Sequence, residues 1–300
     1  MKVLIAGATG LIGKELVKQC HNSGIDVHYL TTSKHKIVTD FNYKGFYWNP
    51  AANEIDSAAL DEVSAIVNLA GASVSKKWTT TYKQEILQSR VEGAAVLYEA
   101  LSNLDHAVQH YISASGISIY PSSEADLYTE DHDAPDDSFL GEVTVAWEVA
   151  ADRLKELGIK VAKIRTGIVL DGQNGALPKI TQPIKYGAGA PLGSGNQWQS
   201  WIHIQDIAGI YMHVLLHGFE GVFNGVAPQA VSNKEMTKLI AKHLKKPLWL
   251  PKVPPFVLNL MLGEMAQLVL DGQNVSAAKI TESGYHFNYP QLSAALEDLL

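Results

Sequence analysis

The first thirteen residues, MKVLIAGATGLIG, constrain the fold more than any other stretch of this chain. The apolar run from Val3 to Ala6 predicts a buried strand, and glycines follow it at positions 7, 10 and 13. A strand that leads through a glycine-rich turn into a helix is how α/β proteins hold a dinucleotide. Glycine permits the tight turn, the close approach of backbone to pyrophosphate, and the packing of helix on strand. We therefore expect a dinucleotide site formed by Gly7, Thr9, Gly10, Leu11, Ile12 and Gly13.

Strand-like and helix-like segments alternate through the first half of the chain. Longer periodic segments predict helices at about 79–104 and 141–157, and short apolar runs predict strands at 26–31, 45–48, 64–69, 110–113 and 160–165. Such alternation is typical of an α/β fold with a doubly wound parallel Rossmann sheet.

The rhythm changes after Arg165. A Gly- and Pro-rich stretch covers 187–195, another helix is expected at about 204–217, and a proline cluster begins at Pro247. The sequence therefore predicts a nucleotide-binding Rossmann domain over 1–170 that also receives part of 200–225. A smaller C-terminal substrate domain is expected from 171–199 and 226–300.

Composition limits the partners and the location. The 300 residues carry 24 Lys and Arg against 31 Asp and Glu, a net charge of −7, with no basic block, so we expect no nucleic-acid partner. The single cysteine, Cys20, cannot form an internal disulfide, which favours a reducing compartment. The N-terminus reads as a strand and not as a signal peptide, and the apolar segment 256–270 falls short of the ~20 residues that span a bilayer. We expect a cytoplasmic protein with a small-molecule substrate and no membrane partner; the oligomeric state stays open.

The end of the second expected strand indicates which nicotinamide cofactor fits. An acidic side chain there would bind the ribose of NAD and repel the extra phosphate of NADP. This chain has Thr31, Thr32, Ser33 and Lys34 instead, hydroxyl groups followed by a cation, and Asp40 lies too far along. The pattern is also compatible with a solvated turn, but it favours NADP (NADPH) over NAD.

Several motifs then resemble one family. They are Asn68-Leu-Ala-Gly-Ala72, Trp78 with Lys83 and Ser89-Arg90, Ser113 to Tyr120, Phe139 to Val143 with Ala146-Trp-Glu148, Arg165 to Leu170, and Trp201 to Asp206. In this order, and with the Gly-x-x-Gly-x-x-Gly spacing, they resemble the atypical epimerase-like family of the extended short-chain dehydrogenase/reductases. The stretch from Asn224 onward resembles that family's short C-terminal domain.

The resemblance implies a Rossmann domain and a smaller substrate domain with the active site between them. It places Leu69, Ala70 and Gly71 on the adenine side of the cofactor, and Arg90 and Ser113 also in the cofactor site. It supplies no substrate, because most members carry only a generic nucleotide-sugar-epimerase-like label and some are described as cell-division inhibitors.

The usual catalytic pair of these enzymes is missing. They use Tyr-x-x-x-Lys, in which a nearby ammonium lowers the tyrosine pKa from about 10. None of the twelve tyrosines here has a lysine four residues later, and Thr144 and Glu148 stand near the expected tyrosine and lysine positions. The usual hydride mechanism therefore cannot be transferred to this chain.

Three interpretations remain open. In the first, Ser115, Tyr120 and Glu148 form a different catalytic group. In the second, hydride passes to an acceptor that needs little acid assistance, such as a conjugated or quinone-like compound. Both make the protein an NADP(H)-dependent oxidoreductase or epimerase. In the third, it is a non-catalytic NADP(H)-binding regulator or redox sensor with a protein partner, linked through the family to cell division.

Other candidates carry less weight. His203 resembles a residue of the substrate cleft, although a lone histidine among apolar neighbours is more often a hydrogen-bonded structural residue. Arg165 and Lys179 are candidates for contact with an anionic group, and surface cations beside a flexible connection are the alternative. His213 and His217 have the spacing of helical metal ligands, but no third ligand accompanies them, so we expect no metal site.

Overall fold

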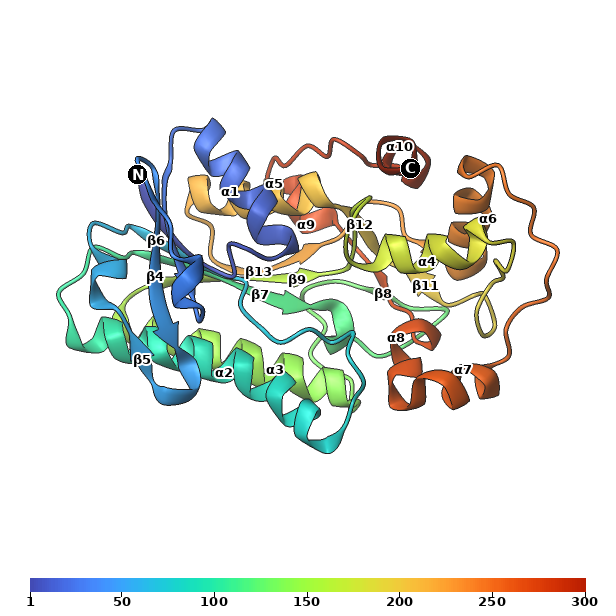
Figure 1. The fold of residues 1–300 in the computed structure, drawn as a ribbon, viewed down its shortest axis with the longest axis horizontal. Coiled ribbons are helices and arrows are strands. Elements are labelled where there is room, and N and C mark those ends of the chain that lie inside the picture. The colour runs from blue at the N-terminus through green and yellow to red at the C-terminus, as the bar shows by residue number, and fades with distance from the viewer.

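A computed structural model describes all of residues 1–300. Its centre is a nine-stranded sheet with the order β13-β9-β7-β6-β1-β2-β4-β3 (Figure 1). Seven strands run parallel: β1 (Lys2–Ala6), β2 (Asp26–Thr31), β4 (Tyr43–Asn49), β6 (Ala65–Asn68), β7 (His110–Gly116), β9 (Lys160–Thr166) and β13 (Gly221–Gly225). Two short strands pair antiparallel with β4: β3 (Thr39–Asp40) and β5 (Glu54–Ile55).

Helices cover both faces of this sheet. In Figure 1, α1 (Leu11–Asn22) and α5 (Ile204–His217) lie on one side, and α2 (Thr80–Asn103) and α3 (Phe139–Asp152) lie on the other. Alternate residues of β1 enter two separate cores, Val3 and Ile5 in one and Leu4 and Ala6 in the other. This explains the unbroken apolar run of β1, since a strand buried on both faces needs no polar side. The doubly wound α/β fold is confirmed.

The winding reverses between β1 and β6. From β1 the chain proceeds through β2 to β4 in one direction, and it then returns to β6 and continues through β7 and β9 to β13 in the other. The crevice beyond the carboxyl ends of two such strands is where open α/β sheets bind ligands. The glycine turn after β1 and the Asn68–Ala72 segment after β6 meet there.

The strand β13 was not expected from the sequence. It reads Gly-Val-Phe-Asn-Gly, which is short and has glycine at both ends, and it pairs with β9 along the edge of the sheet. Other boundaries shifted by a few residues; β7, for example, continues to Gly116 beyond the expected end at 113.

The C-terminal half adds a smaller, mixed region with a core of its own that includes Leu177, Trp201, Ile240 and Leu296. Its two-residue and three-residue strands form three pairs: β10 (Ile168–Leu170) with β12 (Trp201–His203), β11 (Trp198–Gln199) with β14 (Val231–Ser232), and β15 (Asn274–Val275) with β8 (Leu127–Tyr128). Its helices are α4 (Ala176–Lys185), α6 (Asn233–His243), α7 (Pro255–Leu262), α8 (Gln267–Leu270), α9 (Ala278–Glu282) and α10 (Leu292–Leu299). The domain limits given above stay a prediction.

The Trp201–Asp206 motif ties the C-terminal segment to the Rossmann domain. Asp206 is fully buried and accepts hydrogen bonds from the Tyr285 hydroxyl (3.0 Å) and from the backbone N–H groups of Asn288 (2.8 Å) and Tyr289 (2.9 Å). His203 is also fully buried, caps the start of α5, and lies 3.2 Å from Asp298. These contacts support the interpretation of His203 as a hydrogen-bonded structural residue, and its neighbours are C-terminal residues.

None of the helices combines the length and the apolar character that a membrane crossing requires.

Candidate functional site

The turn after β1 requires glycine at positions 7 and 13. Gly7 has a φ of 86°, and a Cβ there would come within 2.9 Å of the Leu69 carbonyl carbon. A Cβ on Gly13 would lie 2.7 Å from the Ala8 Cα, so this glycine allows α1 to pack directly on the turn. The Gly10 N–H donates to the Gly7 carbonyl at 2.9 Å and closes the loop. The three glycines thus serve backbone geometry and close packing.

The start of α1 is available to an anion. Gly10 is the N-cap, so no side chain caps the helix, and the first turn contains no acidic residue. Thr9 and Gly10 are exposed, while Leu11 and Ile12 are half-buried. Uncapped N–H groups and the positive helix end together form an anion site, which fits the pyrophosphate of a dinucleotide.

The end of β2 presents hydroxyl groups and a lysine. The Ser33 N–H donates to the Thr31 hydroxyl at 3.2 Å, and Thr32 and Lys34 are exposed. The Lys34 ammonium lies over the Tyr47 ring, 4.8 Å from its centroid, which places a cation beside the end of β4. No carboxylate stands between Thr31 and Lys36, so this edge suits a phosphate better than a pair of ribose hydroxyls.

Polar side chains of β6, β7 and α2 hold the loop after β6 in place. The Asn68 carboxamide accepts from the Ala70 N–H (3.1 Å) and donates to the Tyr111 hydroxyl (2.9 Å). Arg90 on α2 donates to the carbonyl oxygens of Ala72 (3.2 Å) and Ile86 (2.8 Å), and has no carboxylate partner. Burial lowers the Arg90 pKa to about 10. A buried cation without a counter-ion therefore lies under the exposed Gly71.

A buried polar network lies under the carboxyl ends of β7 and β9. Glu148 on α3 accepts from Arg165 through both carboxylate oxygens, at 2.8 and 3.0 Å, and from the Ser115 hydroxyl at 2.7 Å. The Arg165 guanidinium also donates to the Tyr120 hydroxyl (2.9 Å), which in turn donates to Asn224 on β13 (2.8 Å). These five side chains are less than 10% exposed. The network thus joins three strands and one helix.

Strand register explains why these groups meet. Ser113 and Ser115 on β7 lie opposite Lys163 and Arg165 on β9. Glu148 and Asp152, one turn apart on α3, supply carboxylates to the two cations; Lys163 lies 2.7 Å from Asp152 and 3.6 Å from Glu148. Lys163, Asp152 and Asn224 were not expected from the sequence, although cations at alternate positions of the otherwise apolar strand β9 were a readable signal.

The network restricts proton transfer by its members. Burial opposes ionisation of Glu148, but hydrogen bonds and charge from Arg165 hold its pKa below the usual value. Burial is also the main reason that the Tyr120 pKa is raised. A carboxylate that stays ionised and a phenol that stays neutral are poor acid/base groups near pH 7. The structure brings Ser115, Tyr120 and Glu148 together, and whether they act in catalysis stays a prediction.

Two of the other candidates have partners already. Arg165 is buried and paired with Glu148, so its charge already has a partner inside the protein; contact with an anionic ligand stays a prediction. The Thr144 hydroxyl donates to the Leu140 carbonyl of its own helix at 2.7 Å, so it does not replace the missing tyrosine.

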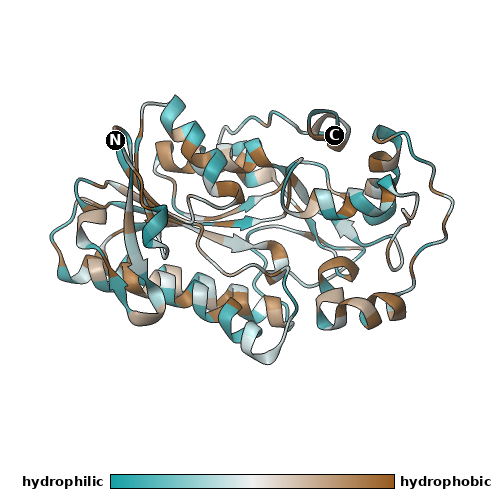
Figure 2. Ribbon diagram, viewed as in Figure 1, coloured by the Kyte–Doolittle hydropathy of each residue, from teal (hydrophilic) through white to brown (hydrophobic).

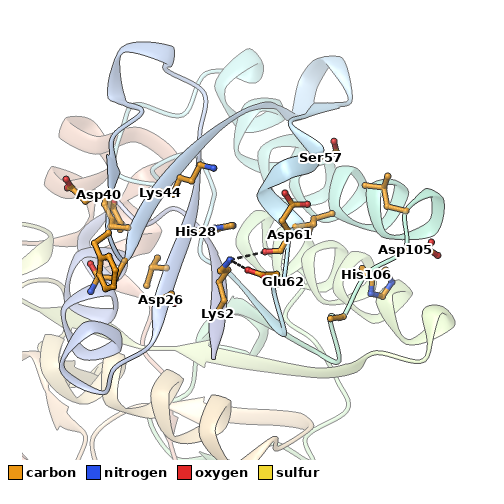
Figure 3. A pocket seen from close by; sticks show the side chains of 17 residues that line it. Lys2, Asp26, His28, Asp40, Lys44, Ser57, Asp61, Glu62, Asp105 and His106 are labelled. Atoms are coloured by element: carbon orange, nitrogen blue, oxygen red, sulfur yellow. Dashed lines mark hydrogen bonds and ion pairs between the residues drawn. The ribbon is translucent and has the colours of Figure 1, made fainter.

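A hollow lies along the amino ends of the strands, at the edge of the sheet opposite the glycine turn (Figure 3). This cavity of about 990 Å³ is lined by residues at the amino ends of the strands, including Lys2, Asp26 and His28, and the Lys2–Glu62 ion pair (2.7 Å) crosses it. Parallel sheets bind ligands at their carboxyl ends, and the charges here are mixed and partly paired, so we do not assign the reaction to this cavity.

A second hollow of about 490 Å³ lies on the carboxyl side, where α2 and α3 begin. Trp78 and Phe139 meet edge to face in its wall with ring centroids 5.1 Å apart. The ammonium of Lys83 lies 4.5 Å from the Phe139 ring centroid and 2.7 Å from Glu264, which belongs to the C-terminal region. This pocket therefore lies between the two parts of the chain and combines aromatic with charged walls.

Comparison with known proteins agrees with this architecture. The model of the NAD dependent epimerase/dehydratase family matches residues 3–226, and a domain of unknown function matches residues 253–299. The chain belongs to the NAD dependent epimerase/dehydratase family. An epimerase family protein of Staphylococcus saprophyticus is 36% identical over 304 residues, covering 99% of this chain and 98% of that protein.

Solved structures give the same result. The human epimerase family protein SDR39U1, crystallised with NADPH, has a TM-score of 0.87 and 29% identity, covering 100% of this chain and 99% of that one. The UDP-glucose 4-epimerase of Thermus thermophilus, in complex with NAD, shares only the fold: its TM-score is 0.77 at 16% identity, over 99% of this chain and 97% of that one. The resemblance to the extended short-chain dehydrogenase/reductases is thus confirmed.

Proposed function

We propose that this protein binds NADP(H) and uses it in an oxidoreductase or epimerase reaction on a small molecule. The observation that carries the proposal is the glycine turn at the switch point of the sheet, facing a β2 end that has hydroxyls and Lys34 and no carboxylate. The human relative crystallised with NADPH supports the same choice of cofactor.

Different residues would bind different parts of the cofactor. Gly7, Gly10 and Gly13 and the start of α1 would hold the pyrophosphate, Thr32 to Lys34 the 2′-phosphate, and Leu69 to Gly71 the adenosine side. When bound, NADPH supplies the hydride. Arg90, which lacks a counter-ion, adds positive charge beneath the same crevice.

The side of the crevice where the reaction takes place would be formed by Ser115, near the carboxyl end of β7, which contacts the Glu148–Arg165 pair. Because the Ser115 hydroxyl already donates its proton to Glu148, it has no proton left to offer a substrate carbonyl. Tyr120 and Glu148 would hold this side in place. An arrangement with strong positioning and weak acid/base power favours an acceptor that needs little protonation, such as a conjugated carbonyl or a quinone.

The aromatic pocket at the start of α2 and α3 is where we would place the substrate. Trp78 and Phe139 offer flat apolar walls, and Lys83 offers a positive charge at the rim. We infer a planar or ring-shaped compound with an acidic or carbonyl group.

One observation favours a different function. The groups at the catalytic positions are all engaged in internal contacts, as in a protein that binds NADP(H) without turnover and signals redox state to a protein partner. This regulator would bind the cofactor equally well but show no hydride transfer.

The test has two stages. Purified protein is titrated with NADPH and NADH while nicotinamide fluorescence is followed, and the NADPH-bound protein is then offered quinone and conjugated carbonyl acceptors. Preferential binding of NADPH with oxidation by an acceptor supports the enzyme, and binding without oxidation by any acceptor supports the regulator. Absence of binding to either nucleotide would overturn both.

A further inference from the structure

One end of the molecule exposes apolar side chains that nothing in the structure covers. On α7, Phe256, Leu260 and Met261 are 71%, 87% and 74% exposed, and Trp249 in the preceding segment is 70% exposed. Figure 2 shows α7 as one of the most apolar helices at the surface. Single exposed apolar residues are normal, but a group of large ones marks an interaction surface.

The same part of the chain is strongly cationic. Between positions 236 and 263 there is no aspartate or glutamate, in a protein whose net charge is −7; the nearest carboxylates are Glu235, in the first turn of α6, and Glu264, which is paired with Lys83. The stretch contains five lysines, all of them exposed and none in an ion pair: Lys238, Lys242, Lys245, Lys246 and Lys252. The helix α10, which packs on α6, carries the exposed carboxylates Glu297 and Asp298, and Asp298 is paired with His203.

These features share one location. In Figure 1, α6, the segment 244–254 and α7 follow one another along the end of the molecule opposite β4 and β5. We call this end the α6–α7 surface. It lies away from the glycine turn, so it is separate from the proposed cofactor site.

We propose that the α6–α7 surface docks onto an anionic lipid bilayer. Lysines attract the negative headgroups, and exposed Trp, Phe, Leu and Met side chains enter the boundary between headgroups and acyl chains. No spanning helix is required, because a protein can lie on a membrane through such a surface. The expectation of no membrane partner rested on the absence of a spanning segment, and it does not exclude this mode of attachment.

Charge argues against a second copy as the occupant. A twofold dimer places the same patch of each copy against the other, so the unpaired lysines of both would meet. An anionic bilayer brings the opposite charge to the same apolar patch.

The test is sedimentation of the full-length protein with vesicles. Vesicles of phosphatidylcholine alone are compared with vesicles of equal parts phosphatidylcholine and phosphatidylglycerol. We expect at least tenfold stronger binding to the anionic vesicles, weakened by salt, since a lysine near such a surface contributes about fivefold. No binding to anionic vesicles, or equal binding to both kinds, would overturn the proposal.

Three variants locate the binding surface. Lys245→Glu/Lys246→Glu and Phe256→Ser/Leu260→Ser should each reduce binding at least tenfold while circular dichroism stays unchanged, because these side chains are exposed. Lys44→Glu/Lys160→Glu makes the same charge change on two exposed lysines of β4 and β9 and should retain more than half of the binding. If this control loses as much as the patch variants, or if sedimentation velocity shows a dimer that Phe256→Ser/Leu260→Ser dissociates, the lipid proposal fails.

Discussion

The two ends of the proposed cofactor crevice are built in opposite ways. At the β1 end, three glycines carry no side chains and no side chain caps α1, so backbone N–H groups are free to bind a ligand. At the β7 and β9 end it fills the space with charged side chains that satisfy one another, centred on Glu148 and Arg165. The first end is prepared for an anion from outside, and the second carries its own counter-ions. The first end is therefore suited to hold the anionic part of a cofactor, and the second end holds the sheet and α3 together.

The largest effect on stability is expected from the Glu148–Arg165 pair at the β7 and β9 end. Glu148→Gln keeps the side-chain shape but removes the charge that faces buried Arg165, and breaking a buried pair by removing one partner costs about 3–5 kcal/mol. We expect a fall of this size in the free energy of unfolding, measured by urea denaturation. Glu142→Gln, at an exposed position in the first turn of the same helix, is the matched control. It removes only a favourable charge at the helix start and should change stability by less than about 1 kcal/mol. A loss no greater than the control's would mean that the network does not hold the sheet.

The same pair predicts a pH dependence. The Glu148 pKa is lowered in the folded protein, so its contribution is complete above the unfolded value of about 4.3 and is lost as the pH falls from there through the folded pKa. The stability difference between the wild type and Glu148→Gln should therefore be constant near neutral pH and shrink in acid. A difference that already shrinks between pH 8 and pH 6, on about the scale of an ordinary histidine titration, would show that another group controls it.

The sequence predicted the structure best where only one residue type can occupy a position, for a reason that lies in the local backbone. The glycine spacing predicted the crevice, because the Gly13 position tolerates no Cβ and that requirement is local. Ser115, Tyr120 and Glu148 were expected to lie together, but their links through Arg165 and Asn224 could not be predicted. Tyr120 and Asn224 are 104 residues apart, and these groups meet only through strand register and the unexpected strand β13. The role of His203 stayed open for the same reason: its partner, Asp298, lies 95 residues away.

At the β1 end, a single charge should prevent binding of NADPH. Gly10→Asp places a carboxylate at the start of α1, where aspartate is a good N-cap, so the fold should persist. The negative charge would occupy the anion site, and we expect NADPH affinity to fall about a hundredfold, roughly 2.7 kcal/mol. Gly10→Asn has nearly the same shape without the charge and should lose much less, as measured by fluorescence titration. Equal losses in both variants would assign the effect to crowding against the Gly7 carbonyl, 3.1 Å from a Cβ at this position.

A smaller effect separates the two nicotinamide cofactors. Lys34→Glu places a carboxylate at the end of β2, which would repel a 2′-phosphate and attract ribose hydroxyls. NADPH affinity should fall about tenfold, near 1.4 kcal/mol, and NADH affinity should stay the same or rise. The exposed Lys36→Glu, two residues further on, is the matched control. If both nucleotides weaken equally in Lys34→Glu, the lysine acts through general attraction and does not select NADP.

The smallest effect on stability should come from the Lys83–Glu264 ion pair, although its N–O distance is as short as that of the buried Arg165–Glu148 pair. The Lys83 ammonium lies 2.7 Å from Glu264, but these side chains are 30% and 64% exposed, against 8% and 9% for Arg165 and Glu148. Water screens an exposed pair and solvates either partner when the other is removed, so Lys83→Met should cost less than about 1 kcal/mol of stability. Because Lys83 lies at the rim of the aromatic pocket, the same variant should raise the KM for an anionic acceptor more than it lowers kcat. A stability loss as large as that of Glu148→Gln would mean that this contact holds the C-terminal region against α2, and that burial alone does not explain why the two pairs differ.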